Sequence, residues 1–582
     1  MNWRLKEKAP ESFFKKFPEY SPQVLQLLFD RGLKTQKEID EFFNPDYKED
    51  LHDPFLMRGM KEAVERIITA RSSGEKIAIF GDYDADGVCG AVILKTIFEA
   101  LGLNLAGIYL PDRDKEGYGL NQKIVRELAK NEVKLIVAVD CGVSDFEEIE
   151  LANSLGLDVL ILDHHRVPKK IPPAKALVDP FQEGDEYPFK ELAAAGVAFK
   201  FVQALLKKAK HNLKEGWEKW LLDLVALATV ADCMKMLGEN RTLVRYGLVV
   251  LAQTQRIGLQ ELMKIARLSP TLEIKTLKTN LDAYSLGFVL GPRLNAAGRV
   301  HHASLAFELL TAENREEAQA LAQKIEGHNR QRQKITDEIF TEIEERLKNK
   351  EFDFKKPVIV EKGTNWPVGI VGLVAGRVAD RRHRPAFILS EDGEILKGSA
   401  RSIPAFNLVE ALESCQELLN GFGGHPAAAG LRIKKENLEA FEEKINEWAN
   451  KKIKKEDLVP EIEVDLEIED EEISWKLFDD LTRFEPFGQG NEAPVFLVRN
   501  FKIKSLKQVG SGSKHLKLEL EPEKIKGKIF GAIGFGMVKN GGGDLKTGDK
   551  IDLVFELLAD EWNGTRNLQL KIIDFKNSGS AS

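Results

Sequence analysis

The stretch KIAIFGDYDADG, residues 76–87, decides the fold of the first half of this chain. Its apolar run predicts a buried strand, and the acidic turn that follows predicts where the strand ends. The next segment, VCGAVILKTIFEALG (88–102), has helical spacing and ends at a glycine. The same succession returns in KLIVAVDCGVSD (134–145) and LDVLILDHHRVP (157–168). Apolar strands that alternate with helices predict an α/β fold, with a parallel sheet covered on both faces.

Clusters of Asp and His follow these apolar segments. They are Asp82, Asp84 and Asp86; Asp140; Asp163, His164 and His165; and Asp232 in VALATVADCMKM (225–236). Ligands of parallel sheets bind at the carboxyl ends of the strands, which is where the clusters fall. Neighbouring carboxylates repel one another unless a cation neutralises them. Simpler interpretations stay open for single clusters: a surface turn or calcium loop for the first, and helix caps for Asp140 and Asp232.

The joint occurrence of the four clusters favours a metal site. Carboxylates with some imidazole suit manganese or magnesium, whereas thiolates would favour zinc. Cys89, Cys141 and Cys233 each lie near a cluster, but no pair of cysteines has the tight spacing of a zinc site. We therefore interpret these cysteines as small buried core residues.

Composition excludes several classes of protein. A chain of 582 residues is too long for a single core, which stops growing at roughly 250–300 residues. Its net charge of −8 argues against a uniformly basic, histone-like binder, although a local basic stripe would still serve nucleic acid. We find neither a membrane-spanning apolar run nor, in MNWRLKEKAPESFF, a secretory signal. Four cysteines without a CxxC pair favour a reducing cytoplasm over a disulfide framework.

The order of the motifs resembles a known family. GDYDADG, VDCGVSD, DHHRVP and ATVADC are similar to the successive motifs of the DHH phosphoesterase superfamily. GPRLNAAGRV (291–300), GSARS (398–402) and FGGHPAAAG (422–430) resemble further motifs of its RecJ family, the single-strand-specific 5′→3′ DNA exonucleases. LHDPFLMRGMKEAVERI (51–67) and PFGQGNEAPVF (486–496) also resemble RecJ, so the similarity runs from near the start to about residue 575.

The resemblance gives names to the predicted segments. It implies a helical segment at 1–75, a DHH catalytic domain at 76–303 and a connecting helix at 304–350. A second α/β domain, the DHH-associated substrate-binding domain, follows at 351–453. Short alternating strands at 454–575 predict a small antiparallel β barrel or sandwich. The resemblance implies that this part is an OB-like nucleic-acid-binding domain, and we expect residues 576–582 to be a disordered tail.

The resemblance also implies two bound divalent ions, Mn²⁺ or Mg²⁺. Its metal ligands correspond to Asp84, Asp86, Asp140, His164 and Asp232, with Asp140 as the bridging carboxylate. Related proteins often have a histidine four residues before the first ligand, where this chain has Phe80. Many also have a histidine after the tryptophan of NWPVGIVGLVAGR (365–377), where this chain has Pro367.

The remaining site residues follow from the same resemblance. The catalytic set is His165 near the scissile phosphate, Asp82 as a support behind the ligands, and Arg293 with Asn295 as donors to phosphate oxygens. The DNA-binding set is Arg299, Arg401, Ser402, Gly423, Gly424 and His425, the last three in a glycine-rich loop. Without the resemblance, that loop would be interpreted as a tight turn.

The implied function is metal-dependent hydrolysis of single-stranded DNA to mononucleotides in recombination and repair. The implied partners are single-stranded DNA, a single-strand-binding protein and a helicase. One alternative is a DHH phosphodiesterase that acts on short RNA or cyclic dinucleotides. Another is an inactive scaffold of a replication complex, which the intact acidic motifs disfavour. Phe484, Phe487 and Phe496 could stack on bases, but we expect them to be core residues.

Overall fold

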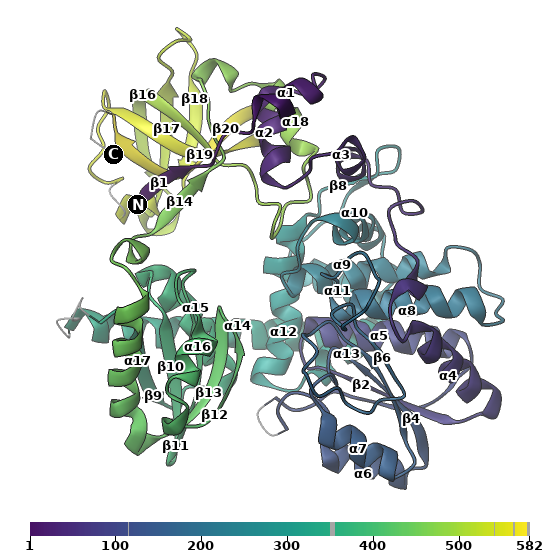
Figure 1. The fold of residues 1–582 in the computed structure, drawn as a ribbon. Coiled ribbons are helices and arrows are strands. Elements are labelled where there is room, and N and C mark those ends of the chain that lie inside the picture. Colours follow the sequence, from purple (N-terminus) through teal and green to yellow (C-terminus); the bar gives the residue numbers. More distant parts are fainter. Residues whose placement is uncertain (114–115, 350–355, 540–541, 563–564, 579–582) are drawn as a thin grey trace. The chain divides into compact units, whose positions relative to one another are not determined.

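The computed structural model describes residues 1–113, 116–349, 356–539, 542–562 and 565–578. The chain forms two compact units (Figure 1). One is Asp46–Leu458, and the other combines Met1–Pro45 with Val459–Ser582. Among the described helices, none is both long enough and apolar enough to cross a membrane.

The larger unit begins with the predicted parallel sheet. Its strands run in the order β3-β2-β4-β5-β6, and all neighbours are parallel. They are β2 (Lys76–Gly81), β3 (Asn104–Tyr109), β4 (Val133–Val139), β5 (Asp158–Leu162) and β6 (Ala176–Val178). The helices next to this sheet are α4 (Met60–Ser73), α5 (Ala85–Ala100), α6 (Gln122–Lys130), α7 (Phe146–Ser154), α8 (Ala194–Lys208) and α9 (Leu222–Ala231).

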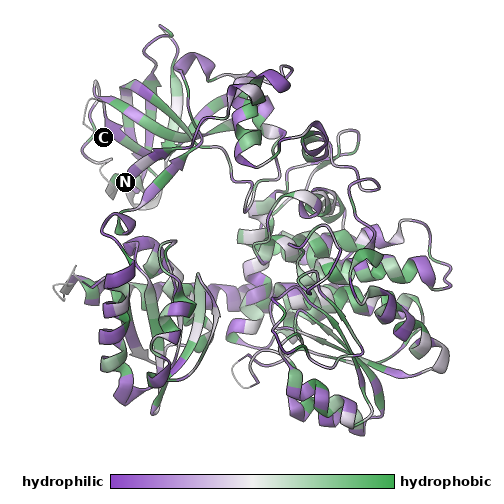
Figure 2. Ribbon diagram, in the orientation of Figure 1, coloured by the Kyte–Doolittle hydropathy of each residue, from purple (hydrophilic) through white to green (hydrophobic). Residues whose placement is uncertain are grey.

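Both faces of the sheet are buried, which explains why its strands are continuously apolar in sequence (Figure 2). Successive side chains of a strand point to opposite faces. Ile77 and Ile79 of β2 pack into the core shared with α4, α5, α8 and α9. Ala78 and Phe80 pack into a second core, shared with α6 and α7. The carboxyl ends of β2, β4 and β5 therefore meet at one edge of a rigid, doubly covered layer.

The segment predicted as one connecting helix contains two helices. α13 is Ser304–Thr311 and α14 is Arg315–Asn349, while residue 350 lies outside the described part. The break has a local cause, because the Asn314 side chain accepts a hydrogen bond from the backbone N–H of Glu317 and so caps the start of α14. Before α13 the chain forms α10 (Gly238–Ala252), α11 (Ile257–Ile265), the strands β7 (Leu272–Glu273) and β8 (Lys278–Thr279), the π-helix η3 (Ser285–Leu290) and α12 (Gly291–Val300).

The second α/β part of the larger unit has a mixed sheet in the order β12-β13-β11-β10-β9. Only β9 and β10 are parallel neighbours. α15 packs on one face, and α16 and α17 pack on the other. The elements are β9 (Ile359–Thr364), α15 (Val368–Arg382), β10 (Ala386–Asp392), β11 (Ile395–Arg401), α16 (Leu408–Glu413), β12 (Leu419–His425), β13 (Ala428–Lys434) and α17 (Leu438–Lys452).

The smaller unit is built on a five-stranded barrel. The strands run β16-β17-β18-β20-β19, and β16 also pairs with β19, which closes the barrel. The strands are β16 (Phe496–Val509), β17 (His515–Glu521), β18 (Phe530–Gly534), β19 (Lys550–Trp562) and β20 (Thr565–Asn577), preceded by β14 (Glu461–Val464), β15 (Leu466–Glu467) and α18 (Trp475–Thr482). β20 runs two residues into the predicted tail, whose residues 579–582 lie outside the described part.

The N-terminal segment is not a single helical unit. Its residues 1–45 belong with the barrel, and they include the strand β1 (Asn2–Leu5), which pairs in parallel with β14. The helices α1 (Glu11–Lys16), α2 (Pro22–Asp30) and α3 (Gln36–Phe43) follow. Phe42 and Phe43 of α3 hold their ring centroids 5.5 Å and 5.2 Å from that of Phe484. Phe484 and Phe496 are fully buried, as expected for core residues, while Phe487 is partly buried.

Candidate metal centre

The first acidic cluster lies in the turn from β2 into α5. Asp84 is the N-cap of α5, because its Oδ1 accepts hydrogen bonds from the backbone N–H groups of Asp86 (2.9 Å) and Gly87 (3.3 Å). A Cβ on Gly87 would lie 2.5 Å from the backbone nitrogen of Asp82, so this turn requires glycine. One oxygen of Asp84 therefore caps α5, and the other oxygen remains for a further ligand.

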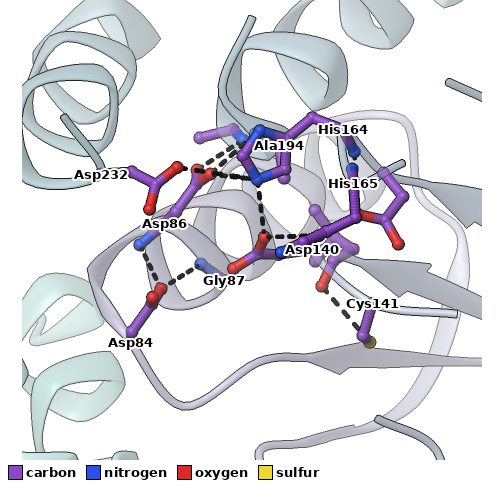
Figure 3. A network of polar contacts seen from close by, with 12 residues as sticks. Asp84, Asp86, Gly87, Asp140, Cys141, His164, His165, Ala194 and Asp232 are labelled. Atoms are coloured by element: carbon purple, nitrogen blue, oxygen red, sulfur yellow. Dashed lines mark hydrogen bonds and ion pairs between the residues drawn. The ribbon is translucent and has the colours of Figure 1, made fainter. Parts of the chain in front are cut away.

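Asp86 is held by a second helix. Its buried carboxylate accepts hydrogen bonds from the backbone N–H groups of Ala194 and Ala195, both at 2.7 Å, in the first turn of α8 (Figure 3). A helix N-terminus favours an anion. Burial nevertheless raises the pKa of Asp86 above its ordinary value, and the charge of Asp84 adds to this effect. The carboxylate is fixed in place but needs positive charge to stay ionised.

Asp140 follows β4 with a left-handed backbone. Its φ is +63°, and its backbone N–H donates to the carbonyl oxygen of Leu162 at 3.1 Å. Aspartate tolerates this conformation better than most residues do. This hydrogen bond to the end of β5 places the Asp140 carboxylate beside His164 (Figure 3).

Three carboxylates converge on the His164 ring. Its Nε2 lies 3.3 Å from Asp140 Oδ1, 3.6 Å from Asp232 Oδ2 and 3.7 Å from Asp86 Oδ2 (Figure 3). Ligand atoms about 2.1 Å from one small cation stand roughly 3–4 Å apart. The ligand atoms of Asp86, His164 and Asp232 lie within 4.8 Å of one another, and so do those of Asp140, His164 and His165. These separations suit metal ligands.

A second group consists of Asp82, Asp84 and Asp140, whose ligand atoms lie within 4.8 Å of one another. Asp82 is buried, and its Oδ1 has no hydrogen-bond partner among the described residues. Burial and the charge of Asp84 raise its pKa well above the ordinary value. An unpartnered buried carboxylate oxygen is costly unless a cation completes it. Asp140 is close to both groups, as a bridging ligand must be.

Asp232 caps the carboxyl end of α9. A carboxylate is unfavourable there, because the helix terminus already carries partial negative charge. Burial, together with Asp86 and Asp84, raises its pKa to about 9. Burial and neighbouring carboxylates likewise raise the pKa of Asp140 well above its ordinary value. Because the donor set is rich in oxygen and includes one imidazole, it fits Mn²⁺ or Mg²⁺.

We expect the raised carboxylate pKa values to make the metal-free protein less stable as pH rises. A carboxyl group with a higher pKa when folded binds more protons in the folded state, so stability falls between its unfolded and folded pKa values. For Asp232 this window runs from the ordinary value of 3.8 to about 9. A bound cation replaces the protons. Between about pH 5.5 and 8.5, the melting temperature without metal should fall by at least roughly 3 °C more than with saturating Mn²⁺.

The control for this measurement is Asp232→Asn, which removes the titrating group and should flatten the metal-free pH profile. Stabilisation by Mn²⁺ that is equal at the two pH values would contradict the expectation.

His165 has a different environment from His164. Its Nδ1 lies 2.8 Å from Asp163 Oδ1 and 3.2 Å from the Tyr118 hydroxyl, which donates to the carbonyl oxygen of Asp140. Burial lowers the pKa of His165, but the hydrogen bond and charge of Asp163 outweigh it and raise the pKa to about 9. In return, His165 holds the pKa of the buried Asp163 below its usual value. His165 therefore lies at the edge of the acidic cluster, with its ring oriented by Asp163.

Several arginines lie close enough to Arg299 to affect its pKa, and so does Asp84. Arg299 of α12 is partly buried and donates to the carbonyl oxygen of Gly369 at 3.0 Å. Burial lowers the pKa of Arg299 to about 10, and the charges of Arg113, Arg332 and Arg401 add to this effect. The charge of Asp84 raises the pKa and offsets part of it. Arg113, whose guanidinium lies 5.0 Å from the Tyr83 ring centroid, was not predicted from sequence. It lies in the loop after β3, where no motif marks it.

Other predicted residues contact the fold itself. Asn295 accepts a hydrogen bond from the Ala85 backbone at 2.7 Å, so it holds the start of α5. Arg293 pairs with Glu326 at 2.9 Å and donates to the carbonyl oxygen of Val289. The Ser402 hydroxyl donates to the carbonyl oxygen of Phe406. Asn295 thus lies at the turn that carries Asp84 and Asp86, whereas Arg293 and Ser402 make these contacts with other parts of the fold.

The predicted glycine-rich loop is the end of strand β12, at the edge of its sheet. Gly423, Gly424 and His425 are exposed. Gly424 has a φ of +145°, and a Cβ there would lie 2.4 Å from the carbonyl oxygen of Ala428. Burial, followed by the charges of His165, Arg166 and His164, lowers the pKa of His425, which places this edge on the same side as the two histidines.

The positions that differ from the family pattern have structural roles. Phe80 is 1% exposed and belongs to the core between the sheet and α6 and α7. Pro367 precedes α15 as its N-cap, where its carbonyl accepts a hydrogen bond from the backbone N–H of Ile370.

Cys89 and Cys141 are buried as predicted, but Cys233 is exposed, so its interpretation as a small buried core residue is wrong. It follows Asp232 at the end of α9, where the chain turns outward with a φ of +56°.

Three domain families match the chain: the DHH family N-terminal domain at residues 76–229, the DHHA1 domain at 355–451 and the RecJ OB domain at 464–574. The chain is 38% identical to the single-stranded-DNA-specific exonuclease RecJ of Bacillus subtilis, over 95% of this chain and 68% of that protein. It is 32% identical to the exonuclease of the same name from Haemophilus influenzae, over 95% of this chain and 96% of that protein.

A solved structure also resembles the whole chain. RecJ from Thermus thermophilus in complex with Mn²⁺ superimposes with a TM-score of 0.83 at 26% identity, covering 100% of this chain and 80% of the other. The complex of that protein with Mg²⁺ gives a TM-score of 0.77 at 25% identity, covering 100% of this chain and 79% of the other.

Proposed function

Because this chain belongs to the RecJ family, we propose that it is a metal-dependent exonuclease that hydrolyses single-stranded DNA 5′→3′ to mononucleotides. The gathering of Asp86, Asp140 and Asp232 around the Nε2 of His164 is the observation that carries this proposal. Its biological setting would be DNA recombination and repair.

Two divalent cations, Mn²⁺ or Mg²⁺, would occupy the centre. Asp86, Asp140, His164 and Asp232 would hold one, and Asp82, Asp84 and Asp140 would hold the other. Asp82 is thus proposed as a ligand rather than as a support. When bound, such cations offset the charge of the phosphodiester and activate water as the nucleophile.

The chain's own residues then bind and orient the phosphates. The protonated His165, oriented by Asp163, would donate a hydrogen bond to the scissile phosphate as its negative charge develops. Arg299, Arg401 and Arg113 would bind the terminal phosphate, because guanidinium groups pair with phosphate through two N–H donors.

The remaining predicted residues would either contact the DNA strand or position residues that do. The exposed edge of β12 at Gly423, Gly424 and His425 would offer backbone and imidazole donors to the strand. Arg293 and Asn295 would act by positioning α12 and the start of α5. Ser402 would hold the turn that carries Arg401.

The barrel would bind the trailing strand. Phe535, which directly follows β18, is 60% exposed, and its ring centroid lies 5.4 Å from that of His515 at the start of β17. Exposed aromatic rings on the second and third strands of an OB-type barrel suit base stacking.

A deletion of the barrel is a poor test of this role, because residues 1–45 would lose the part of the chain that they pack against. Phe535→Ala is the cleaner test, and unchanged affinity for a long strand would remove this role.

The assay of the proposed function is a time course on end-labelled DNA. With Mn²⁺, a single strand labelled at its 5′ end should release labelled mononucleotide from the first turnover, whereas a 3′ label should stay on shortening fragments. A blunt duplex of the same sequence should resist cleavage. Faster turnover of dinucleotides or cyclic dinucleotides would favour the phosphodiesterase alternative, and no turnover of any of these would favour the scaffold.

Binding to a single-strand-binding protein, binding to a helicase and a cytoplasmic location remain predictions. Four free cysteines agree with a reducing compartment. Co-purification of the full chain with a single-strand-binding protein would test the first partner, and absence of that protein from the purified fraction would argue against it.

A further inference from the structure

Two exposed aromatic rings stack on each other at the π-helix η3. The ring centroids of Tyr284 and Phe288 lie 5.2 Å apart with an interplanar angle of 18°. Tyr284 is 64% exposed and Phe288 is 72% exposed. Neither residue belongs to a motif of the sequence analysis. Two flat apolar rings held parallel in solvent are unusual, because burying them would be favourable.

The backbone beneath the pair is firmly held. Ser285, Leu286 and Leu290 of η3 are buried, so the element packs on its inner side and presents the two rings on its outer side. The Asp282 carboxylate fixes the start of η3, accepting hydrogen bonds from the Ser285 N–H at 2.8 Å and from its hydroxyl at 2.6 Å. π-Helices are rare and occur mainly at functional sites. The backbone that carries the two rings is thus held in place.

The element that carries the pair packs against the helix that leads into the metal centre. A Cβ on Gly287 would lie 3.1 Å from Val230 Cγ1, and a Cβ on Gly291 would lie 3.1 Å from Ala231 Cβ. η3 therefore packs against the last turn of α9, and the next residue of the chain is the proposed metal ligand Asp232. α12, which continues from η3, contacts α9 and carries Arg299 (Figure 1).

We propose that Tyr284 and Phe288 form a stacking platform for an unpaired base of the DNA strand near the scissile bond. This inference rests on the proposed function. A base stacks on an aromatic ring whatever its identity, which suits an enzyme that digests any sequence. In a duplex the faces of the bases are covered by their neighbours and the strands are paired. A platform beside the metal centre therefore contributes to selection of single strands.

The test uses the full chain and a long single strand with 2-aminopurine at successive positions from its 5′ end. Stacking quenches this base, so the wild-type protein should quench one position near the end most strongly, and the readout needs no cleavage. The double variant Tyr284→Ala/Phe288→Ala should lose that quenching. It should also raise KM for the long strand about ten-fold, with kcat at saturating DNA unchanged.

Matched variants separate stacking from other effects. Phe288→Tyr keeps a flat ring and should keep the quenching, whereas Phe288→Leu keeps only apolar surface and should lose it. Trp220→Ala removes a 42% exposed aromatic from η2 (Trp217–Leu221), which precedes the other end of α9, and should change nothing.

Several outcomes would overturn the platform. They are full quenching and unchanged KM in the double variant, an equal loss in Trp220→Ala, or loss of a bound protein from the double variant with DNA binding intact. If the wild-type protein cleaves no DNA, the proposed function fails. The quenching pattern then still decides whether the rings stack on a base.

Discussion

Asp140→Asn should reduce cleavage of single-stranded DNA by at least about 10³-fold, because losing even one partner behind a metal ligand commonly costs about 10- to 100-fold. Asp140 is the carboxylate close to both proposed metal groups, with its Oδ1 3.3 Å from His164 Nε2. An amide keeps the shape of the side chain but removes its charge, so both cations would bind more weakly. The measurements are initial rates with Mn²⁺ and the Mn²⁺ affinity of each protein.

Asparagine is the right substitution at this position because Asp140 has a φ of +63°. Asparagine tolerates that backbone, whereas Asp140→Ala would add strain of roughly 1 kcal/mol. Both variants should keep their affinity for single-stranded DNA within a few-fold, since Arg299, Arg401 and the barrel are untouched. Turnover of Asp140→Asn close to the wild-type rate would contradict the assignment of the ligands.

His165→Ala should lower kcat by about 10²- to 10⁴-fold, the usual contribution of a positioned proton donor. His165 is held by Asp163 at 2.8 Å, and the hydrogen bond and charge of Asp163 outweigh burial and raise its pKa to about 9. Its removal takes away a hydrogen bond to the phosphate, but neither His164 Nε2 nor any of the three carboxylates around it. The Mn²⁺ affinity should therefore stay within a few-fold of the wild-type value.

His164→Ala is the matched variant, one residue away in the same turn. It should lose both kcat and Mn²⁺ affinity, because three carboxylates converge on its Nε2. If the two histidine variants lost equal Mn²⁺ affinity, His165 would itself be a ligand. The proposed division of roles would then be wrong.

The sequence predicted the parts of the site that follow from strand periodicity. A parallel sheet brings the carboxyl ends of β2, β4 and β5 to one edge, and the residues after each strand could be expected to meet there. His164 and the three carboxylates around it come from such positions and from the end of α9. The barrel could be predicted for a similar reason, because short alternating strands joined by turns cannot bury their apolar faces otherwise.

Other features depend on contacts that local patterns do not encode. Arg113 lies in a loop, and only the folded chain brings it near Arg299. The place of Asp82 depends on the path of a glycine-containing turn. Residues 1–45 join the barrel through β1, whose partner β14 begins more than 450 residues later. The helix start at Asn314 had a visible signal, since asparagine is a good N-cap, but the polar stretch around it obscured the boundary.

The central claim is that separated carboxylates and one imidazole hold two cations beside the DNA backbone. Anomalous scattering from Mn²⁺-soaked crystals tests it most directly. We expect two manganese peaks, one among Asp86, Asp140, His164 and Asp232, and the other among Asp82, Asp84 and Asp140. A single peak, or peaks outside these residues, would contradict it.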